Sequence, residues 1–235
     1  VVEKPPQRVV AAETATDYRI VDTPEALDEL MASLAPAKYL VIDVETTGND
    51  ARRAELVGIA VSAAPGRAWY VPVGHRWVER QLPRPQVIGR VKPLMEDDAI
   101  PKFAHNGKFD ITVLSNYGVE LKGFSFDTMI AAYLLGEKAL GLKPLAFSKL
   151  GIEMTPITAL IGTGAKQISM AQVLVPQAAK YACADADICG QLKGLLEVEL
   201  KEQGLWSLFT DLEMPLLPVL FRLEKNGVAL DTALL

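Results

Sequence analysis

VIDVETTG, residues 41–48, is a short apolar run that contains two acidic residues two positions apart, Asp43 and Glu45. Alternate residues of a strand point to the same face, so these two carboxylates are expected to project side by side. Neighbouring acids repel each other and lose hydration, a cost that a bound cation would offset. The stretch therefore predicts a metal site, although it also fits a strand that ends in a solvated loop.

The segments around this stretch predict a mixed sheet. Residues 39–44 are apolar on both sides, which is typical of a central strand covered on both faces. Residues 56–62 and 68–73 follow as two strands, and Pro65-Gly66 between them favours the turn of an antiparallel meander. We also expect strands at residues 18–21 and 102–104, and helices at residues 24–34, 85–95, 108–117, 128–135, 176–203 and 205–223. Strands that alternate with helices after such a meander indicate an α/β domain.

The composition is that of a globular domain, since half of the 235 residues are hydrophobic and 23% are charged. No apolar run approaches the roughly 20 residues that span a bilayer. Residues 1–17 also lack the pattern of a signal peptide. We therefore expect a cytoplasmic protein that has no membrane partner.

The chain has few cysteine and histidine residues that could bind a soft metal ion. Cys183 and Cys189 fall on different faces of one expected helix, and the histidines are limited to His75 and His105. A disulfide or a zinc site is therefore not expected, and the cysteines are predicted to be buried and reduced. Any metal would have oxygen ligands, which favours Mg²⁺ or Mn²⁺.

The net charge of −5 argues against binding to nucleic acid by electrostatic attraction alone. The charge is unevenly distributed along the chain. Residues 101–170 hold seven lysines and five acids, whereas the rest of the chain has an excess of acids. If a surface for nucleic acid exists, we expect it in this middle third.

Two further segments supply acids in suggestive settings. In residues 104–110, AHNGKFD, a strand end leads into a helix, and Asp110 lies one turn after Asn106. In residues 181–185, YACAD, Tyr181 and Asp185 are spaced four apart on a helix and so share one face. Each has a structural alternative, because an acid is favoured in a first turn and a tyrosine ring is common in a core.

Together these segments resemble the proofreading 3′→5′ exonucleases of the DEDD superfamily, in the tyrosine subclass, and above all the exonuclease domain of family A bacterial DNA polymerases. Residues 43–47, DVETT, resemble the first exonuclease motif, residues 106–110 the second and residues 181–185 the third. Residues 126–129 and 213–216 are also similar to segments of those polymerases. The resemblance implies a ribonuclease H-like mixed sheet with an antiparallel three-strand meander, flanked by helices.

The resemblance also implies a mechanism with two divalent ions, Mg²⁺ or Mn²⁺, that hydrolyses a phosphodiester by in-line attack of water. Asp43 would contact both ions, Glu45 and Asp185 the first ion, and Asp110 the second. Tyr181 and Glu45 would orient the attacking water. The partner would be a single-stranded or frayed DNA 3′ end, from which deoxynucleoside 5′-monophosphates are released one at a time.

Three further residues are implied to contact the substrate: Thr46, Asn106 and Lys108. Asn106 is equally well explained as the cap of a helix. Family members commonly have leucine at the position of Asn49, so stacking on the terminal bases is expected to be weaker here. Asp187, two positions after Asp185, is expected at the surface because it points to another side of its helix.

Residues 136–170 are broken by glycines and prolines into short helical pieces, so we expect a mobile region. Within it, residues 161–166, IGTGAK, lack the spacing of a phosphate-binding loop and follow no strand. We expect this loop either to touch single-stranded DNA or to be solvated.

The resemblance divides the chain into three parts. Residues 1–16 are expected to be a linker or tail, residues 17–203 the exonuclease domain, and residues 204–235 the start of the polymerase domain, which would be the partner in the same longer chain. Two alternatives remain. One is a catalytically silent domain that binds DNA or braces the polymerase, and the other is a 3′→5′ exoribonuclease of the RNase D type.

Overall fold

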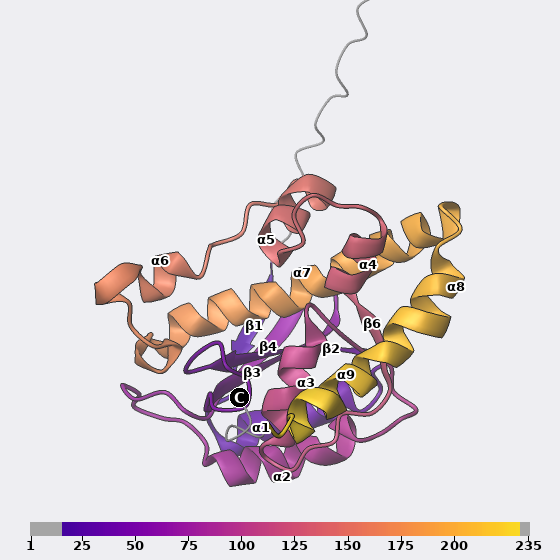
Figure 1. Cartoon of the computed structure of the whole chain (residues 1–235). Helices are drawn as coiled ribbons and strands as arrows, with labels where there is room; N and C mark the ends of the chain where they lie inside the picture. Colours follow the sequence, from indigo (N-terminus) through magenta and orange to yellow (C-terminus); the bar gives the residue numbers. More distant parts are fainter. Residues whose placement is uncertain (1–15, 231–235) are drawn as a thin grey trace, which may run out of the picture.

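The computed structural model describes residues 16–230 and shows a six-stranded sheet with helices on both faces (Figure 1). The strands lie in the order β1-β4-β3-β2-β5-β6, and β2, β3 and β4 form an antiparallel meander. Strands β1, β5 and β6 pair in parallel with their neighbours, which confirms the predicted mixed sheet. The strands are β1 (Asp17–Ile20), β2 (Leu40–Thr46), β3 (Leu56–Ala64), β4 (Arg67–Pro72), β5 (Lys102–Ala104) and β6 (Phe124–Asp127).

The helices cover both faces of this sheet. On one face, α7 runs across the strands, and α1 and α2 lie on the opposite face (Figure 1). The long helices are α1 (Pro24–Leu34), α2 (Arg84–Met95), α3 (Gly107–Ser115), α4 (Thr128–Leu134), α7 (Val175–Glu202) and α9 (Met214–Asn226). The short helical segments are α5 (Leu142–Leu145), η1 (Ala146–Leu150), α6 (Thr158–Ile161), η2 (Gly164–Lys166), η3 (Met170–Gln172), α8 (Trp206–Leu208) and η4 (Phe209–Glu213).

Strand β2 is central and contributes to a hydrophobic core on each of its faces, as predicted. Val41 packs in the core that contains α7, whereas Ile42 and Val44 pack in the core that contains α1 and α2. Because side chains alternate along a strand, Asp43 and Glu45 lie on the same side as Val41. The strand therefore directs both acids toward α7.

The local sequence explains where helix α1 begins and which of its side chains pack against the sheet. Thr23 caps the helix by accepting a hydrogen bond from the backbone N–H of Ala26 at 3.2 Å. Pro24 then occupies the first turn, where its missing N–H costs nothing. Every third or fourth residue of the helix is buried against the sheet, and each such leucine contributes roughly 1.5–3 kcal/mol of burial free energy. These buried residues are Leu27, Leu30 and Leu34.

Strand β6 was not predicted from the sequence. It has four residues at the edge of the sheet and pairs in parallel with β5, Phe103 lying opposite Phe126. A strand this short presents only two residues to each face, which is too few for a clear alternation. Helix α3 also ends two residues earlier than predicted, at Ser115.

The helix predicted at residues 205–223 is interrupted. A segment of π-helix, η4, separates α8 from α9 and ends two residues before Pro215. Proline removes one N–H from the hydrogen-bond ladder, and a π turn is one way to absorb that defect. The interruption therefore takes the form of a π-helical segment. Residues 228–230 have no regular structure.

Residues 136–170 form the predicted series of short helical pieces, namely α5, η1 and α6 with η2 and the start of η3. Gly151 ends η1 in the left-handed region, with φ of 70°, where a side chain would be strained. Leu145 and Ala146 are fully buried against the α7 side of the core. No helix within residues 16–230 is long and apolar enough to cross a membrane. The tail predicted at residues 1–16 lies, except for its last residue, outside the described residues.

Candidate active site

Asp43 and Glu45 lie at the end of β2 where the sheet becomes irregular. The register between β2 and β3 shifts between Glu45 and Thr46, so a β-bulge follows the second acid. Bulges re-aim side chains and are common next to functional sites. Glu45 pairs with Gly58 on β3, and a Cβ atom on Gly58 would lie 2.1 Å from the Tyr70 hydroxyl oxygen. Glycine is thus required here to let Tyr70 fit beside the acids.

A buried histidine, His75, holds the Tyr70 side chain in place. The Tyr70 hydroxyl and His75 Nε2 are 2.8 Å apart, and His75 Nδ1 is 2.9 Å from the Val173 carbonyl oxygen. A carbonyl can only accept, so Nδ1 carries the proton and Nε2 accepts from the Tyr70 hydroxyl. Burial lowers the pKa of His75, which keeps this tautomer neutral. Burial, together with Glu45 and Asp43, raises the pKa of Tyr70.

Helix α7 brings Asp185 and Tyr181 over the same end of β2. Asp185 is buried, and Tyr181 is half-buried one turn earlier on the same helix face, as predicted. Burial raises the pKa of Asp185, and the interaction with Tyr181 opposes this rise, whereas burial and Asp185 both raise the pKa of Tyr181. The Asp185 Oδ1 atom is buried and has no hydrogen-bond partner among the described residues. It is therefore available to a cation.

Asp110 reaches the cluster from α3. Its Oδ1 atom accepts a hydrogen bond from the backbone N–H of Val44 at 2.9 Å. Strand β5 pairs with β2 only at residues 40–41, so Val44 lies beyond this pairing and its N–H is free to meet the carboxylate. Asp110 is thus attached to the strand that carries the first two acids.

Asp127 positions α3, a function that sequence analysis missed. It caps α4, where it accepts from the N–H groups of Met129 and Ile130. It also accepts from the backbone N–H groups of Asn106 at 3.1 Å and Gly107 at 2.7 Å. One buried carboxylate therefore fixes the starts of two helices, because β6 lies beside β5. The FDTM segment was noted in the sequence, but its neighbour in space was not.

The electrostatics of the four acids show that they form one cluster. Burial and the neighbouring Asp185 raise the pKa of Asp43 to about 7. Burial, with Asp43 and Asp185, raises the pKa of Glu45 well above its ordinary value. Burial and Asp43 do the same for Asp110, and burial raises the pKa of Asp185. The structure thus brings together all four predicted acids.

Lys143 is a second residue that sequence analysis missed. Its ammonium forms an ion pair with Asp185 Oδ2 and lies 4.2 Å from the centre of the Tyr181 ring. Within residues 16–230, no three His, Cys, Asp or Glu side chains form a ready-made metal site. The donor set nevertheless suits a hard cation, since it consists of carboxylate oxygens and includes the unpartnered Asp185 Oδ1.

The three predicted substrate residues lie beside the cluster. Asn106 and Lys108 line a groove of about 560 Å³, whose wall also includes Asn49. Thr46 is half-buried and donates its hydroxyl to the Gly48 carbonyl oxygen at 2.8 Å, so it shapes the loop after β2. The Lys108 ammonium forms an ion pair with Glu224 of α9.

The capping alternative for Asn106 is wrong. Asn106 occupies the N-cap position of α3, but its side chain makes no capping hydrogen bond and is exposed. Its backbone is left-handed, with φ of 63° and ψ of 44°, and it is the one residue other than glycine with positive φ in the described part of the chain. Such strained positions gather at functional sites. The side chain is free to contact a ligand.

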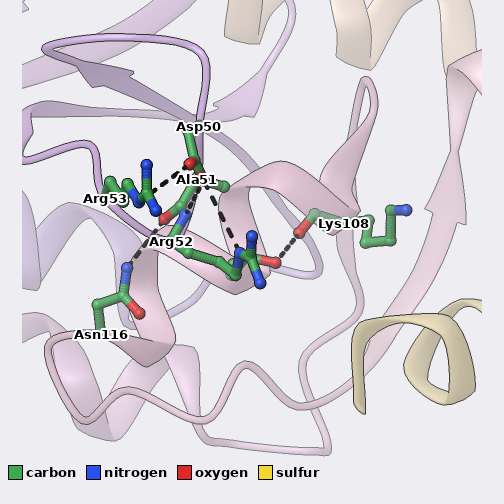
Figure 2. A network of polar contacts seen from close by, with 7 residues as sticks. Asp50, Ala51, Arg52, Arg53, Lys108 and Asn116 are labelled. Atoms are coloured by element: carbon green, nitrogen blue, oxygen red, sulfur yellow. Dashed lines mark hydrogen bonds and ion pairs between the residues drawn. The ribbon is translucent and has the colours of Figure 1, made fainter. Parts of the chain in front are cut away.

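The loop between β2 and β3 also lines this groove, through residues 49–52. Figure 2 shows Asp50 between the side chains of Arg52 and Arg53, while the Asn116 amide donates to the Ala51 carbonyl oxygen at 2.9 Å. These contacts tie the loop to the end of α3. The loop thus contributes one arginine, Arg52, to the lining of the groove.

Asp187 is buried, which corrects its predicted place at the surface. It accepts hydrogen bonds from the Tyr18 hydroxyl at 2.8 Å and the Gly66 N–H at 2.9 Å, and from the Gln191 amide at 3.0 Å. Asp187 does point away from Asp185, as the helical spacing requires, but that direction faces β1 and the turn between β3 and β4. Its function is structural.

Comparison with known proteins identifies the family. A family model described as 3′-5′ exonuclease matches residues 18–201. DNA polymerase I of Chloroflexus aurantiacus is 42% identical over 215 residues, which are 90% of this chain and 23% of that protein. DNA polymerase I of Pseudomonas aeruginosa is 37% identical, over 93% of this chain and 25% of that protein. The chain thus spans about a quarter of the length of these curated relatives.

Solved structures share the fold at lower identity. The POL domain of Pol1 from M. smegmatis, in complex with DNA primer-template and dNTP, matches with a TM-score of 0.71 and 23% identity, over 91% of this chain and 33% of that chain. Brucella melitensis NrnC with bound Mg²⁺ gives 0.67 and 21%, over 91% and 95%. Escherichia coli RNase D gives 0.68 and 19%, over 91% and 52%.

These structural likenesses support the ribonuclease H-like arrangement of the sheet, and the sequence matches carry the assignment further. The family model covers all three of the motifs that contain the clustered acids. Because this model matches most of the chain, and the sequence relatives are DNA polymerases I, the chain belongs to the 3′-5′ exonuclease family of DNA polymerase I.

Proposed function

We propose that this domain is a metal-dependent proofreading exonuclease. It hydrolyses the terminal phosphodiester at a single-stranded or frayed 3′ end of DNA and releases deoxynucleoside 5′-monophosphates. The observation that carries this proposal is the convergence of Asp43, Glu45, Asp110 and Asp185 from three elements at the end of β2. Their mutually raised pKa values mark a cluster that is costly without a cation.

The acids are proposed to hold two divalent ions, Mg²⁺ or Mn²⁺. Asp43 is central, because its charge acts on both Glu45 and Asp110, and it would serve both ions. Glu45 and Asp185 would hold the first. Asp110 keeps Oδ2 for the second, since Oδ1 is engaged by the Val44 N–H. When bound, such ions stabilise the attacking and leaving oxygens of the phosphodiester.

Tyr181 and Glu45 are proposed to position the water that attacks the phosphorus atom. Burial and the acids around it, Asp185 first, raise the pKa of Tyr181, so its hydroxyl stays protonated. A protonated hydroxyl can donate one hydrogen bond and accept another, which fixes the orientation of a water molecule. Glu45 faces the same space from β2 and can accept a proton of that water.

The groove beside the cluster is proposed to hold the sugar and phosphate next to the terminal nucleotide. Asn106 has an exposed amide held in place by a strained backbone, and Lys108 can exchange its partner Glu224 for a phosphate. Thr46 keeps the loop after β2 in place. Asn49 offers an amide where an apolar wedge would stack on a base, so its contribution to binding is weaker.

The domain limits and the partners belong to the same proposal. We propose residues 17–203 as the exonuclease domain and residues 204–235 as the start of a polymerase domain in a longer cytoplasmic protein. Residues 1–16 would then be a linker. Gly204, with φ of 70°, follows the end of α7 and supports the proposed boundary at this point. Phe209 packs on Phe126 with ring centres 4.7 Å apart, so the following segment is anchored on this domain.

Two alternatives make different predictions. A catalytically silent domain would not need the acids, whereas Asp43, Glu45, Asp110, Asp185 and Tyr181 are all present and clustered. An exoribonuclease of the RNase D type would share the cluster. The RNase D structures match at 19–20% identity and support the fold alone, whereas the sequence relatives are DNA polymerases.

Degradation of 3′-labelled single-stranded DNA with Mg²⁺ or Mn²⁺ tests the proposal. We expect the native chain to shorten the DNA stepwise and Asp43→Ala to abolish this activity. Glu29→Ala, an exposed acid of α1 on the opposite face of the sheet, serves as the matched control and retains activity. Equal activity in the native chain and Asp43→Ala, or none in either, would refute the proposal. Preference for an RNA strand of the same sequence would favour the exoribonuclease.

A further inference from the structure

Lys143 lies inside the carboxylate cluster although none of the three motifs contains it. It belongs to α5, and its ammonium pairs with Oδ2 of Asp185. The ammonium also lies over the ring of Tyr181, 4.2 Å from its centre, where a cation–π contact is favourable. Lys143 thus contacts both of the α7 residues assigned to catalysis.

The charge of Lys143 reaches further than its contacts. It acts on Asp43 and Glu45 of β2 as well as on Asp185, and for each of the three acids it opposes the rise in pKa that burial causes. Within residues 16–230, it is the one basic side chain that forms an ion pair with an acid of the cluster. The cluster therefore has a single internal counter-charge.

This counter-charge and a divalent ion cannot share Asp185 without cost. An ion bound to Asp185 would lie within a few ångströms of the ammonium, and like charges at that distance repel strongly in a partly buried site. The lysine can leave, because its side chain is 23% exposed and has four rotatable bonds. Asp185 Oδ1 already lacks a partner, so the approach of an ion is favourable on that side.

We propose that Lys143 is a positioning residue that competes with the metal for Asp185. Before metal binds, it neutralises part of the cluster and holds Asp185 against Tyr181. Metal binding displaces the ammonium, so Lys143 sets the divalent-ion concentration at which the site becomes loaded. This inference rests on the proposed function, in which the four acids bind divalent ions.

Calorimetric titration of the metal-free chain with Mn²⁺, without nucleic acid, tests the competition. Lys143→Met removes the charge and keeps the length, and we expect it to bind Mn²⁺ on the order of tenfold more tightly. Lys143→Arg keeps the charge and is expected to restore the native affinity. Lys149→Met, which removes a lysine paired with Glu137 and Glu199 one turn beyond α5, is the matched control with native affinity.

Equal or weaker Mn²⁺ affinity in Lys143→Met would overturn the inference. If the native chain degrades DNA while Lys143→Met gains no affinity, the inference fails and the proposed function stands. If the native chain binds no Mn²⁺, both fail. A second readout needs no metal: in EDTA, Lys143→Met is expected to melt below the native chain because the acids lose their counter-charge. An unchanged or higher melting temperature would also overturn the inference.

Discussion

Replacing Asp43 with asparagine is expected to stabilise the metal-free protein at neutral and higher pH. Burial and Asp185 raise the pKa of Asp43 to about 7 from 3.8. An acid whose pKa is raised by folding favours the folded state only while it is protonated. The stability is therefore fully present below pH 3.8 and is lost as the pH rises through about 7. Asparagine keeps the shape of the side chain and removes this loss.

The magnitude follows from the same two values. At 1.36 kcal/mol per pH unit, the difference between about 7 and 3.8 corresponds to about 4 kcal/mol above pH 7. The Asp43 side chain keeps part of its surface in solvent, which screens the charge. We therefore expect Asp43→Asn to gain roughly 2 kcal/mol of unfolding free energy. For a domain of this size, that corresponds to roughly 5 °C in melting temperature.

Thermal melts in EDTA between pH 4 and pH 8.5 test this prediction. The difference between Asp43→Asn and the native chain should be small at pH 4, grow toward pH 7 and then level off. Saturating Mg²⁺ is expected to reverse the order, because binding stabilises the native chain and Asp43→Asn loses a ligand. A lower melting temperature for Asp43→Asn at pH 8 in EDTA would refute the reasoning, because Asp43 would then have a favourable partner in the fold.

The remaining predictions concern structure, catalysis and substrate binding. Asp187→Ala should lose about 2–4 kcal/mol of unfolding free energy in urea, because the Tyr18 hydroxyl and the Gly66 N–H lose their acceptor; a loss below 0.5 kcal/mol would contradict this structural function. Tyr181→Phe should lower kcat about a hundredfold and leave Mn²⁺ affinity unchanged, since the hydroxyl positions water; a native kcat would exclude that function. Asn49→Leu should lower KM for single-stranded DNA several-fold through an added apolar contact, and a KM that is unchanged or higher would show that Asn49 does not face the terminal bases.

The pairing of site residues within one element could be predicted from regular structure, whereas the assembly of the acids into one site was implied only by the family resemblance. Asp43 and Glu45 share a face through the period of two in a strand, and Tyr181 and Asp185 share one through the spacing of four in a helix. Lys143 could not be predicted in this way. It lies in α5, a helix of four residues within a segment that glycines and prolines divide, and its place over α7 depends on packing far along the chain.

The contacts of the buried aspartates Asp187 and Asp127 also could not be predicted from the sequence. The spacing of Asp187 correctly places it on a different side of α7 from Asp185. Whether that side meets solvent or protein depends on where β1 lies, and the β1 residue that contacts Asp187, Tyr18, is 169 residues away in the sequence. Asp127 likewise became a positioning residue only because β6 pairs with β5.

Hydrogen bonding separates the acids that maintain the fold from those assigned to catalysis. Asp127 accepts from four backbone N–H groups, and Asp187 accepts from three donors on three elements of the structure. Asp185 is equally buried, yet one of its oxygens has no partner among the described residues and the other is held by a movable lysine. A buried acid whose oxygens all have hydrogen-bond partners has no free acceptor for a ligand. A buried acid with an unpartnered oxygen lowers the stability of the fold unless a ligand binds it. The incomplete bonding of Asp185 is therefore the feature that points to binding, and Lys143 limits its cost until the metal replaces it.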